Sequence, residues 1–287
     1  MSVKMNIPFK IDLSGKVVAI TGGAGVLGES FGHALAACGA QVAIIDLNEE
    51  AAERVANTIL DSGGKAMAAA ANVLDKDSLA AAAAKVEAEW GPCDLLLNGA
   101  GGNHPKGTTT KEVLEAADLD DPELLSFFDL DSAGVSHVFN LNFLGTLLPT
   151  QAFARQMIGR PGCSIINISS MNAFRPLTKI PAYSGAKAAI SNFTQWLAVH
   201  FAGVGIRVNA IAPGFFLTNQ NRALLVGSDE APTERAAKII AHTPMRRFGE
   251  ADELIGALLF LASEPASSFV NGVVLPVDGG FSAYSGV

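Results

Sequence analysis

The feature that most constrains the fold is a regular alternation of short apolar runs with longer helical patterns. The apolar runs show no two-residue polar alternation, which indicates strands that are buried on both faces of a sheet. Strands that alternate with helices predict right-handed crossovers between parallel strands. We therefore expect an α/β fold with a doubly wound, seven-stranded parallel sheet and helices on both faces. The expected strands are 17–21, 41–46, 65–73, 94–99, 163–169, 205–212 and 272–278, and the expected helices are 26–38, 48–62, 75–90, 135–158, 182–203 and 250–263.

The length of 287 residues suits one large α/β domain, because no linker or internal repeat divides the sequence. We expect one catalytic domain over 1–287, with insertions at about 102–132 and 213–249 after the fourth and sixth strands. Ligands of open α/β sheets bind outside the carboxyl ends of the strands, so both insertions are expected to act as lids. The alternative is that the insertions are disordered surface segments without a role at the site. This alternative is less favoured for 213–249, because that segment contains a helical pattern of its own.

The charge and cysteine content exclude several classes of partner. A net charge of −8 opposes binding to nucleic acid or to an anionic membrane. The N-terminal residues lack an apolar signal core, and no apolar run is long enough to span a membrane, so a cytoplasmic protein is expected. Cys38, Cys93 and Cys163 lie far apart in the sequence, which favours buried thiols and predicts no metal site.

The stretch TGGAGVLG at 21–28 lies between the first strand and the first helix. This is the context of a dinucleotide-binding turn, in which glycines let the backbone approach a pyrophosphate and the helix N-terminus offers free N–H groups. It identifies the expected sheet as a Rossmann fold. We expect three glycines to shape the turn and the Val26 side chain to point away from the pyrophosphate. The residues expected to contact the cofactor here are Thr21, Gly22, Gly25, Val26, Leu27 and Gly28.

Asp46 ends the second strand, 18 residues beyond Gly28. Its carboxylate can accept hydrogen bonds from ribose hydroxyls and repels a 2′-phosphate, so NAD(H) is favoured over NADP(H). The alternative is that Asp46 caps the next helix, a role that Asn48 can fill instead. Further cofactor contacts are expected at the ends of the third and fourth strands, where ordinary strand-ending turns are the alternative. These residues are Asn72, Val73, Asn98, Gly99 and Ala100.

Tyr183 and Lys187 are four residues apart at the start of a helix, so their side chains share one face. Tyrosine titrates near ~10, and a neighbouring ammonium is expected to lower that pKa by favouring the phenolate. Ser170, at the carboxyl end of a buried strand, can hold a substrate oxygen. The set suits proton transfer to or from a carbinol oxygen. A tyrosine and a lysine at this spacing also occur together by chance.

These motifs occur in order together with Asn142 in NFLG and with Pro213-Gly214, and over residues 12–281 the sequence resembles the short-chain dehydrogenase/reductase family. The resemblance implies that Tyr183 is the general acid/base and that Lys187 holds the nicotinamide ribose. It implies hydride transfer at the nicotinamide ring and a homotetramer formed through the helices near 135–158 and 182–203. In the remaining implied roles, Ser170 positions the reacting oxygen, Asn142 anchors a water beside Lys187, and the nicotinamide carboxamide meets Pro213, Gly214 and Thr218.

A narrower resemblance links GPCDLLLNGAGGNHP (91–105), residues 165–201 and the terminal PVDGGFSAYSGV to the D-mannonate oxidoreductases within this family, also called fructuronate reductases. Gluconate 5-dehydrogenases or other polyol dehydrogenases, and a sensor that binds NAD(H) without turnover, are the alternatives. A sugar acid or polyol needs polar partners, and its carboxylate needs a cation. The candidates are Asn103, His104, Asn172, Arg175, Lys179, Asn221 and Arg222, each of which can also be an ordinary loop residue.

Overall fold

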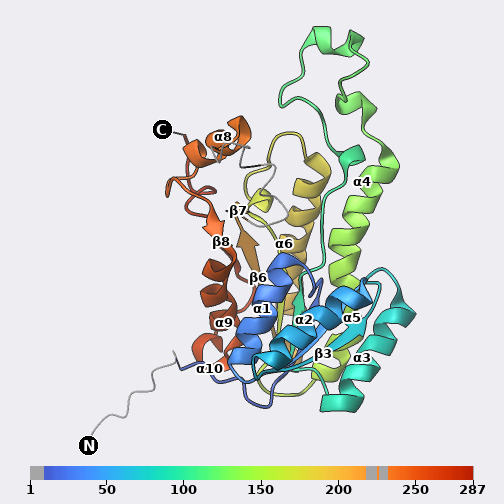
Figure 1. Ribbon diagram of the computed structural model, residues 1–287, viewed down its shortest axis with the longest axis vertical. Coiled ribbons are helices and arrows are strands. Elements are labelled where there is room, and N and C mark those ends of the chain that lie inside the picture. Colours follow the sequence, from blue (N-terminus) through green and yellow to red (C-terminus); the bar gives the residue numbers. More distant parts are fainter. Residues whose placement is uncertain (1–9, 218–224, 226–231, 287) are drawn as a thin grey trace, which may run out of the picture.

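A parallel sheet of seven strands forms the centre of the computed structural model, which describes residues 10–217, 225 and 232–286 (Figure 1). Its strand order is β3-β2-β1-β4-β5-β6-β9, so the direction of winding reverses between β1 and β4. In open α/β sheets this reversal marks the ligand-binding crevice. The strands are β1 (Val17–Thr21), β2 (Gln41–Asp46), β3 (Lys65–Ala70), β4 (Leu95–Asn98), β5 (Cys163–Ile168), β6 (Ile206–Pro213) and β9 (Val274–Val277).

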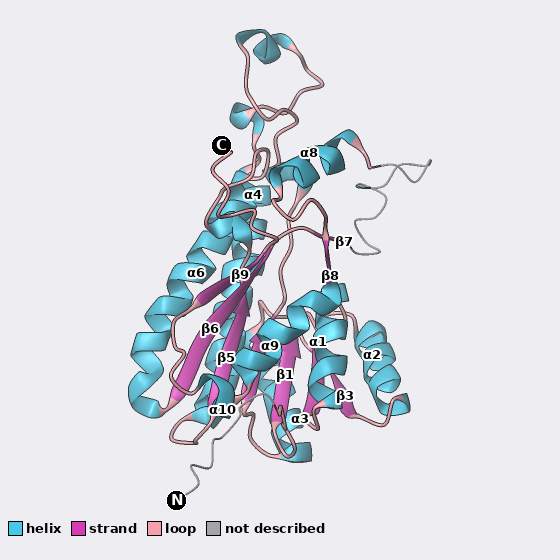
Figure 2. Ribbon diagram, turned by 90° about the vertical axis from the view of Figure 1, so that its left-hand side faces the viewer, coloured by secondary structure: helices cyan, strands magenta, loops and turns pink. Residues whose placement is uncertain are grey.

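Helices cover both faces of this sheet and bury two separate hydrophobic cores (Figure 2). On one face, Phe31 of α1, Ile59 of α2 and Leu258 of α9 pack on the strands. On the other face, Leu79 of α3, Phe153 of α5 and residues of α6 do the same. The helices are α1 (Val26–Ala37), α2 (Glu49–Asp61), α3 (Lys76–Trp90), α4 (Ser132–Phe139), α5 (Gly145–Ala154), α6 (Pro181–Phe201), α8 (Glu234–His242), α9 (Ile255–Ala262) and α10 (Glu264–Ser267).

The predicted fold class is confirmed, with differences at the ends of elements. The third strand ends at Ala70 rather than at residue 73. The reason is local, because the Asn72 side chain accepts a hydrogen bond from the backbone of Leu74 and forms a turn in place of a strand ladder. The helix expected over 135–158 begins at Ser132, where Asp131 caps it, and a π-helical segment, Asn140–Leu144, separates α4 from α5.

Smaller features were not anticipated. A two-stranded parallel pair, β7 (Phe216–Leu217) and β8 (Gly249–Glu250), joins the two ends of the second insertion.

Cys93 and Cys163 are buried as predicted, whereas Cys38 is partly exposed. Within the described part of the protein, no helix has both the length and the apolar character needed to cross a membrane.

The two insertions lie at the same end of the molecule, beyond the carboxyl ends of the strands (Figures 1 and 2). The segment 102–132 projects furthest, and α8 of the second insertion lies beside the C-terminal residues below it. Parallel strands bring their carboxyl ends to one edge of a sheet. Residues that follow different strands therefore meet beneath these insertions.

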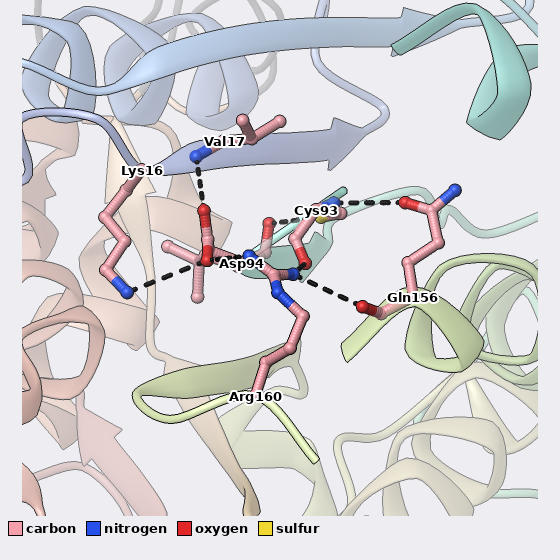
Figure 3. A network of polar contacts seen from close by, with 7 residues as sticks. Lys16, Val17, Cys93, Asp94, Gln156 and Arg160 are labelled. Atoms are coloured by element: carbon pink, nitrogen blue, oxygen red, sulfur yellow. Dashed lines mark hydrogen bonds and ion pairs between the residues drawn. The ribbon is translucent and has the colours of Figure 1, made fainter. Parts of the chain in front are cut away.

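The opposite edge of the sheet is held by a network around Asp94, which directly precedes β4 (Figure 3). Its carboxylate accepts a hydrogen bond of 2.9 Å from the Val17 backbone and one of 2.6 Å from Arg160. Arg160 also donates to the carbonyl oxygen of Cys93, at 2.7 Å. Lys16 lies 3.7 Å from Asp94. The network joins β1, β4 and the loop before β5 away from the candidate site.

We expect Asp94→Ala to lower the free energy of unfolding by about 3 kcal/mol, because it leaves a partly buried guanidinium and a strand amide without their acceptor. Urea denaturation measures this loss. The matched control is Lys16→Met, which removes only the longer, more exposed contact and should cost less than about 1 kcal/mol. A smaller loss for Asp94→Ala than for Lys16→Met would contradict this account.

Candidate active site

The three predicted chemical residues come together at the carboxyl end of β5 and the start of α6. Pro181 occupies the first turn of α6, where its fixed backbone angle favours a helix start, so Tyr183 and Lys187 lie in the first two turns. Ser170 follows β5, is only 8% exposed, and forms a hydrogen bond with the Tyr183 side chain. The Lys187 ammonium lies 5.5 Å from the centroid of the Tyr183 ring. The predicted grouping of these side chains is therefore present.

Lys187 is a buried cation with a defined partner. Its side chain is 4% exposed, and Nζ donates a hydrogen bond of 2.8 Å to the carbonyl oxygen of Ile168, the last residue of β5. Burial lowers the pKa of Lys187 to about 8, because the charged form loses solvation. The ammonium has three donors, so two remain for other groups at the site.

The net shift of the Tyr183 pKa is opposite to the one expected from the neighbouring ammonium. Burial raises the pKa of Tyr183 to about 12, and the hydrogen bond with Ser170 lowers it by a smaller amount. The ammonium lies over the ring and donates to Ile168, so it does not offset the lost solvation of the phenolate. At neutral pH, Tyr183 is consequently a phenol that can donate a proton.

Gly101, in the turn after β4, is the point where three elements meet. A Cβ atom at this position would lie 2.6 Å from Oδ1 of Asn142 and 3.2 Å from Nζ of Lys187, so only glycine fits between them. Asn142 belongs to the π-helical segment, and its side-chain amide donates to the Gly102 carbonyl oxygen at 2.7 Å. Such segments are frequent at functional sites. The β4 turn, the α4–α5 connection and α6 therefore form one wall of the site.

The two glycine-rich turns, after β1 and β4, touch one another. A Cβ atom on Gly22 would lie 2.8 Å from the backbone of Ala100, and Gly22 has a φ of 64° that glycine adopts without strain. The Thr21 hydroxyl is fully buried and accepts from the backbone amides of Gly99, at 3.2 Å, and Ala100, at 3.4 Å. Thr21 therefore holds the second turn in place.

The start of α1 fits an anionic ligand. Gly25 precedes the first helical residue and has no side chain to cap it, so the first backbone N–H groups of this 12-residue helix remain available. Gly28 packs against the turn, because a Cβ there would lie 2.3 Å from the Gly22 carbonyl oxygen. The predicted spacing of Gly22, Gly25 and Gly28 thus matches the geometry of the turn. The outward direction of Val26 stays a prediction.

Asp46 ends β2 beside the same turn, and the alternative that it caps α2 is wrong. Asn48 is the cap, with its side chain accepting from Ala51 at 3.0 Å. Each Asp46 carboxylate oxygen accepts one backbone hydrogen bond, from Ala24 or from Asn48, both at 3.1 Å. A carboxylate has about four acceptor positions, so Asp46 can also accept from ribose hydroxyls.

The structure shows the local surroundings of three residues that are predicted to contact the cofactor. Both Nδ2 hydrogens of Asn98 have buried acceptors, Thr150 at 3.0 Å and Asn167 at 2.9 Å, so this side chain joins β4 to its neighbours and faces away from a ligand. Asn72 is exposed and uses its Oδ1 in the local turn. Val73 is 8% exposed and packs against Gly145. The Asn98 side chain therefore supports the crevice, whereas the contacts of Asn72 and Val73 with a cofactor stay predictions.

On the other side of the crevice, β6 ends at Pro213, and Gly214 passes close to the end of β9. The Gly214 amide donates to the Val277 carbonyl oxygen at 2.9 Å, and a Cβ on Gly214 would lie 2.6 Å from Asp278. The contacts of Pro213 and Gly214 with a nicotinamide carboxamide stay predictions. Thr218 lies outside the described residues.

A cavity of about 700 Å³ opens between the two insertions and the loop before α6. Arg175 and Lys179, two of the predicted substrate residues, line it together with Phe215 and Phe281. Asn172 is 4% exposed, and its Oδ1 finds no hydrogen-bond partner within the described residues, so it remains a candidate. The candidates Asn221 and Arg222 lie outside the described residues.

Asn103 and His104 are held by contacts within their own turn. The Asn103 amide donates to Thr108 at 3.1 Å. His104 caps a short helical turn by accepting from Lys106 at 3.2 Å, and its ring packs against His137 with centroids 5.1 Å apart. These contacts favour the structural alternative for both residues. No cluster of three or more His, Cys, Asp or Glu side chains in the described ranges is placed to hold a metal ion.

A protein-family model described as short-chain dehydrogenase matches residues 16–227, which contain both glycine-rich turns, Ser170, Tyr183 and Lys187. The protein belongs to the short-chain dehydrogenase family. It is therefore an oxidoreductase of this family.

Individual relatives refine this assignment. A Haemophilus influenzae protein named only as an uncharacterized oxidoreductase is 59% identical over 287 residues, with 100% of both chains covered. A Haemophilus structure with bound NAD, provisionally named a D-mannonate oxidoreductase, has a TM-score of 0.94 and 59% identity and covers 98% of this chain and 100% of its own. A Burkholderia cenocepacia gluconate 5-dehydrogenase in complex with NADP and tartrate has a TM-score of 0.79 and 33% identity, with coverage of 96% and 98%.

The sequence interpretation of this oxidoreductase missed the α8 side of the cavity. Arg235, Lys238 and His242 line it, and Glu112 of the first insertion faces them. The sequence carried a usable signal, since the three basic residues recur at the spacing of one helix face within an insertion expected to cover the site. Their cavity-facing direction depends on tertiary packing.

We expect Lys187→Met to abolish activity while raising the free energy of unfolding at pH 7 by about 1 kcal/mol. Burial holds the Lys187 pKa at about 8 rather than 10.5. The charged Lys187 therefore lowers the free energy of unfolding by about 3 kcal/mol relative to a lysine with an ordinary pKa. Loss of the bond to the Ile168 carbonyl offsets about 2 kcal/mol of that gain. The gain is fully present below pH 8 and fades as the pH rises towards 10.5, because the native lysine loses its proton first. Urea denaturation between pH 7 and 10.5 measures the stability difference between Lys187→Met and the wild type. A difference in favour of Lys187→Met that grows with pH would contradict the role given to the buried charge.

Proposed function

We propose that the protein is an NAD-dependent oxidoreductase that interconverts a hydroxyl and a carbonyl group of a sugar acid, with D-mannonate and D-fructuronate as the substrate pair. The observation that carries this proposal is the grouping of Ser170, Tyr183 and Lys187 at the carboxyl end of β5, next to the loop segment 175–179, which lines a cavity together with basic side chains of α8. The provisional name of the Haemophilus structure supports the same substrate.

The protonation states of the site suit carbonyl reduction at neutral pH. Tyr183, with its pKa raised by burial, donates its proton to the carbonyl oxygen as that oxygen gains negative charge. The Ser170 hydroxyl holds the same oxygen. Bound NADH supplies the hydride. Lys187 places a positive charge beside the Tyr183 ring and stabilises the phenolate that proton donation leaves.

The turn after β1, the start of α1 and Asp46 would hold the dinucleotide, with Gly214 and Pro213 near the nicotinamide end. Asp46 favours NAD over NADP because it would repel a 2′-phosphate. Arg54 is the basic residue on α2, and both of its terminal nitrogens contact Glu29, which leaves it poorly placed to bind that phosphate. Bound NAD in the Haemophilus structure agrees with this preference.

A gluconate 5-dehydrogenase is the second candidate, and the Burkholderia relative that bears this name supports it. Both candidates act on a polyol acid and need the same acid/base residues, so the choice between them depends on the cavity. A sensor without turnover is disfavoured, because Ser170, Tyr183 and Lys187 are all present and adjacent.

The exposed face of α6 supports a homo-oligomer, for which we propose a tetramer. Trp196 is 55% exposed and Val199 is 80% exposed, and Trp196 stacks between Phe193 and His200. A row of exposed apolar side chains on a helix is typical of a protein contact. Burial of this face in a subunit interface would link assembly to the active site, because the same helix carries Tyr183 and Lys187.

We expect Tyr183→Phe to lower kcat for NADH-dependent reduction by about 10²–10⁴-fold, because the proton donor is lost. The dissociation constant for NADH should stay within about twofold, since the phenol does not contribute to the pyrophosphate end. Loss of NADH absorbance with fructuronate and with 5-ketogluconate measures turnover, and NADH fluorescence measures binding. Turnover equal to that of the wild type would remove Tyr183 from the mechanism.

We expect Asp46→Asn to lower the ratio of kcat/KM for NAD to that for NADP by at least about tenfold, because the charge that repels a 2′-phosphate is removed. Initial rates with each cofactor and a saturating sugar acid provide the measurement. Asp77→Asn, an exposed change elsewhere, is the control and should leave the ratio unchanged. An unaltered ratio for Asp46→Asn would show that selectivity has another source.

A further inference from the structure

The cavity beside the loop that leads to Tyr183 is bordered by basic side chains from two separate elements. Lys179 lies on the loop that leads into α6, four residues before Tyr183. Arg235, Lys238 and His242 lie on one face of α8, on the other side of the cavity. A ligand that lies in this cavity therefore meets positive charge from both elements.

Three carboxylates, those of Glu112, Glu115 and Glu234, also line the cavity, and one of them already pairs with one of these cations. Glu112, from the first insertion, forms an ion pair with Lys238 of α8. The hydrogen bond from Lys238 holds the pKa of the Glu112 carboxyl below its ordinary value, and the charges of Lys179 and Arg235 act in the same direction. Glu112 and Lys238 are 126 residues apart in sequence, so the two insertions meet here. Lys238 therefore already binds a carboxylate in the folded protein.

Two other cations on the cavity wall, Arg175 and Lys111, are committed to neighbours. Arg175 donates its Nε–H to the Ser282 carbonyl oxygen at 3.2 Å and so holds the C-terminal segment. Lys111 pairs with Asp118 at 2.7 Å and with Glu115 at 2.9 Å. Lys238 differs from Lys111, because its partner Glu112 is exposed, whereas Lys111 also pairs with the buried Asp118. Exposed ion pairs contribute little free energy, so another carboxylate can displace Glu112.

The backbone around Lys179 is built to present this residue. Its φ of 70° is uncommon for a residue with a side chain, and such conformations persist where surrounding contacts enforce them. Its carbonyl oxygen accepts a hydrogen bond of 2.8 Å from Thr109 of the first insertion. The loop that leads to Tyr183 and the segment that carries Glu112 are thereby joined next to the basic group.

We propose that Lys238, assisted by Lys179, binds the carboxylate of the acid substrate, and that Glu112 competes with that carboxylate for the same ammonium. This inference rests on the proposed function. Hydroxyl contacts nearer to Tyr183 hold the rest of the substrate, and the Lys238 subsite distinguishes an acid from a neutral polyol of equal length. Because Glu112 competes for Lys238, it weakens the apparent affinity of this subsite for the acid.

The test is isothermal titration calorimetry of the full-length protein saturated with NADH, a cofactor form that cannot oxidise the titrated compounds. D-mannonate and D-gluconate are the acid probes, and D-mannitol is the neutral probe. We expect Lys238→Met to weaken binding of both acids about tenfold and to leave mannitol unchanged. Glu112→Gln should strengthen acid binding about two- to fivefold and leave mannitol unchanged. A misfolded variant would not produce this gain.

Lys106→Met is the matched control, because Lys106 forms a similarly exposed ion pair with Asp131, at 3.1 Å, and does not line the cavity. The subsite is overturned if Lys238→Met leaves acid binding within twofold of the control, if it weakens mannitol equally, or if the wild type binds neither acid.

The two proposals fail separately. Acid binding that depends on Lys238, without oxidation when NAD replaces NADH, would overturn the proposed function and leave the subsite standing. If the protein oxidises mannonate but Lys238→Met does not change acid binding, the subsite is overturned and the proposed function stands.

Discussion

Every functional feature of this protein depends on the parallel arrangement of its strands. Parallel strands require a crossover over one face of the sheet between successive partners, so all carboxyl ends meet at one edge. Thr21, Asp46 and Ser170 follow three different strands and reach the same edge for this reason alone. Only short turns and two insertions are then needed to build a site. The opposite edge, where Asp94 and Arg160 join the strands, is free to serve stability.

The site introduces charge into an interior that is otherwise apolar. Lys187 lies between β5 and the Tyr183 ring at a pKa well below that of a solvated lysine, and Tyr183 has a pKa above its ordinary value. Both shifts come from burial, so the same apolar packing that stabilises the sheet opposes the charged forms of these residues. The native fold tolerates this local cost because the remaining strands and helices bury extensive apolar surface.

Sequence patterns predicted those parts of the site that depend on local spacing. The glycine turn, the four-residue separation of Tyr183 and Lys187, and the strand-ending position of Asp46 are all set by the periods of helix and strand. The partners of Asn98 and the ion pair between Glu112 and Lys238 were not predictable in this way, because they join residues far apart in the sequence. The sign of the Tyr183 pKa shift was missed because burial outweighs the neighbouring charge.

The π-helical segment Asn140–Leu144 has a consequence for how this protein can evolve. An α-helix turns by about 100° per residue, so one residue more or less rotates everything that follows by that angle. The π-helical turn absorbs such an extra residue and lets α4 present Val138 to α6 while α5 presents Phe153 to the sheet. Natural variation in this region should therefore preserve length more strictly than residue identity, since a deletion would turn one of the two faces towards solvent.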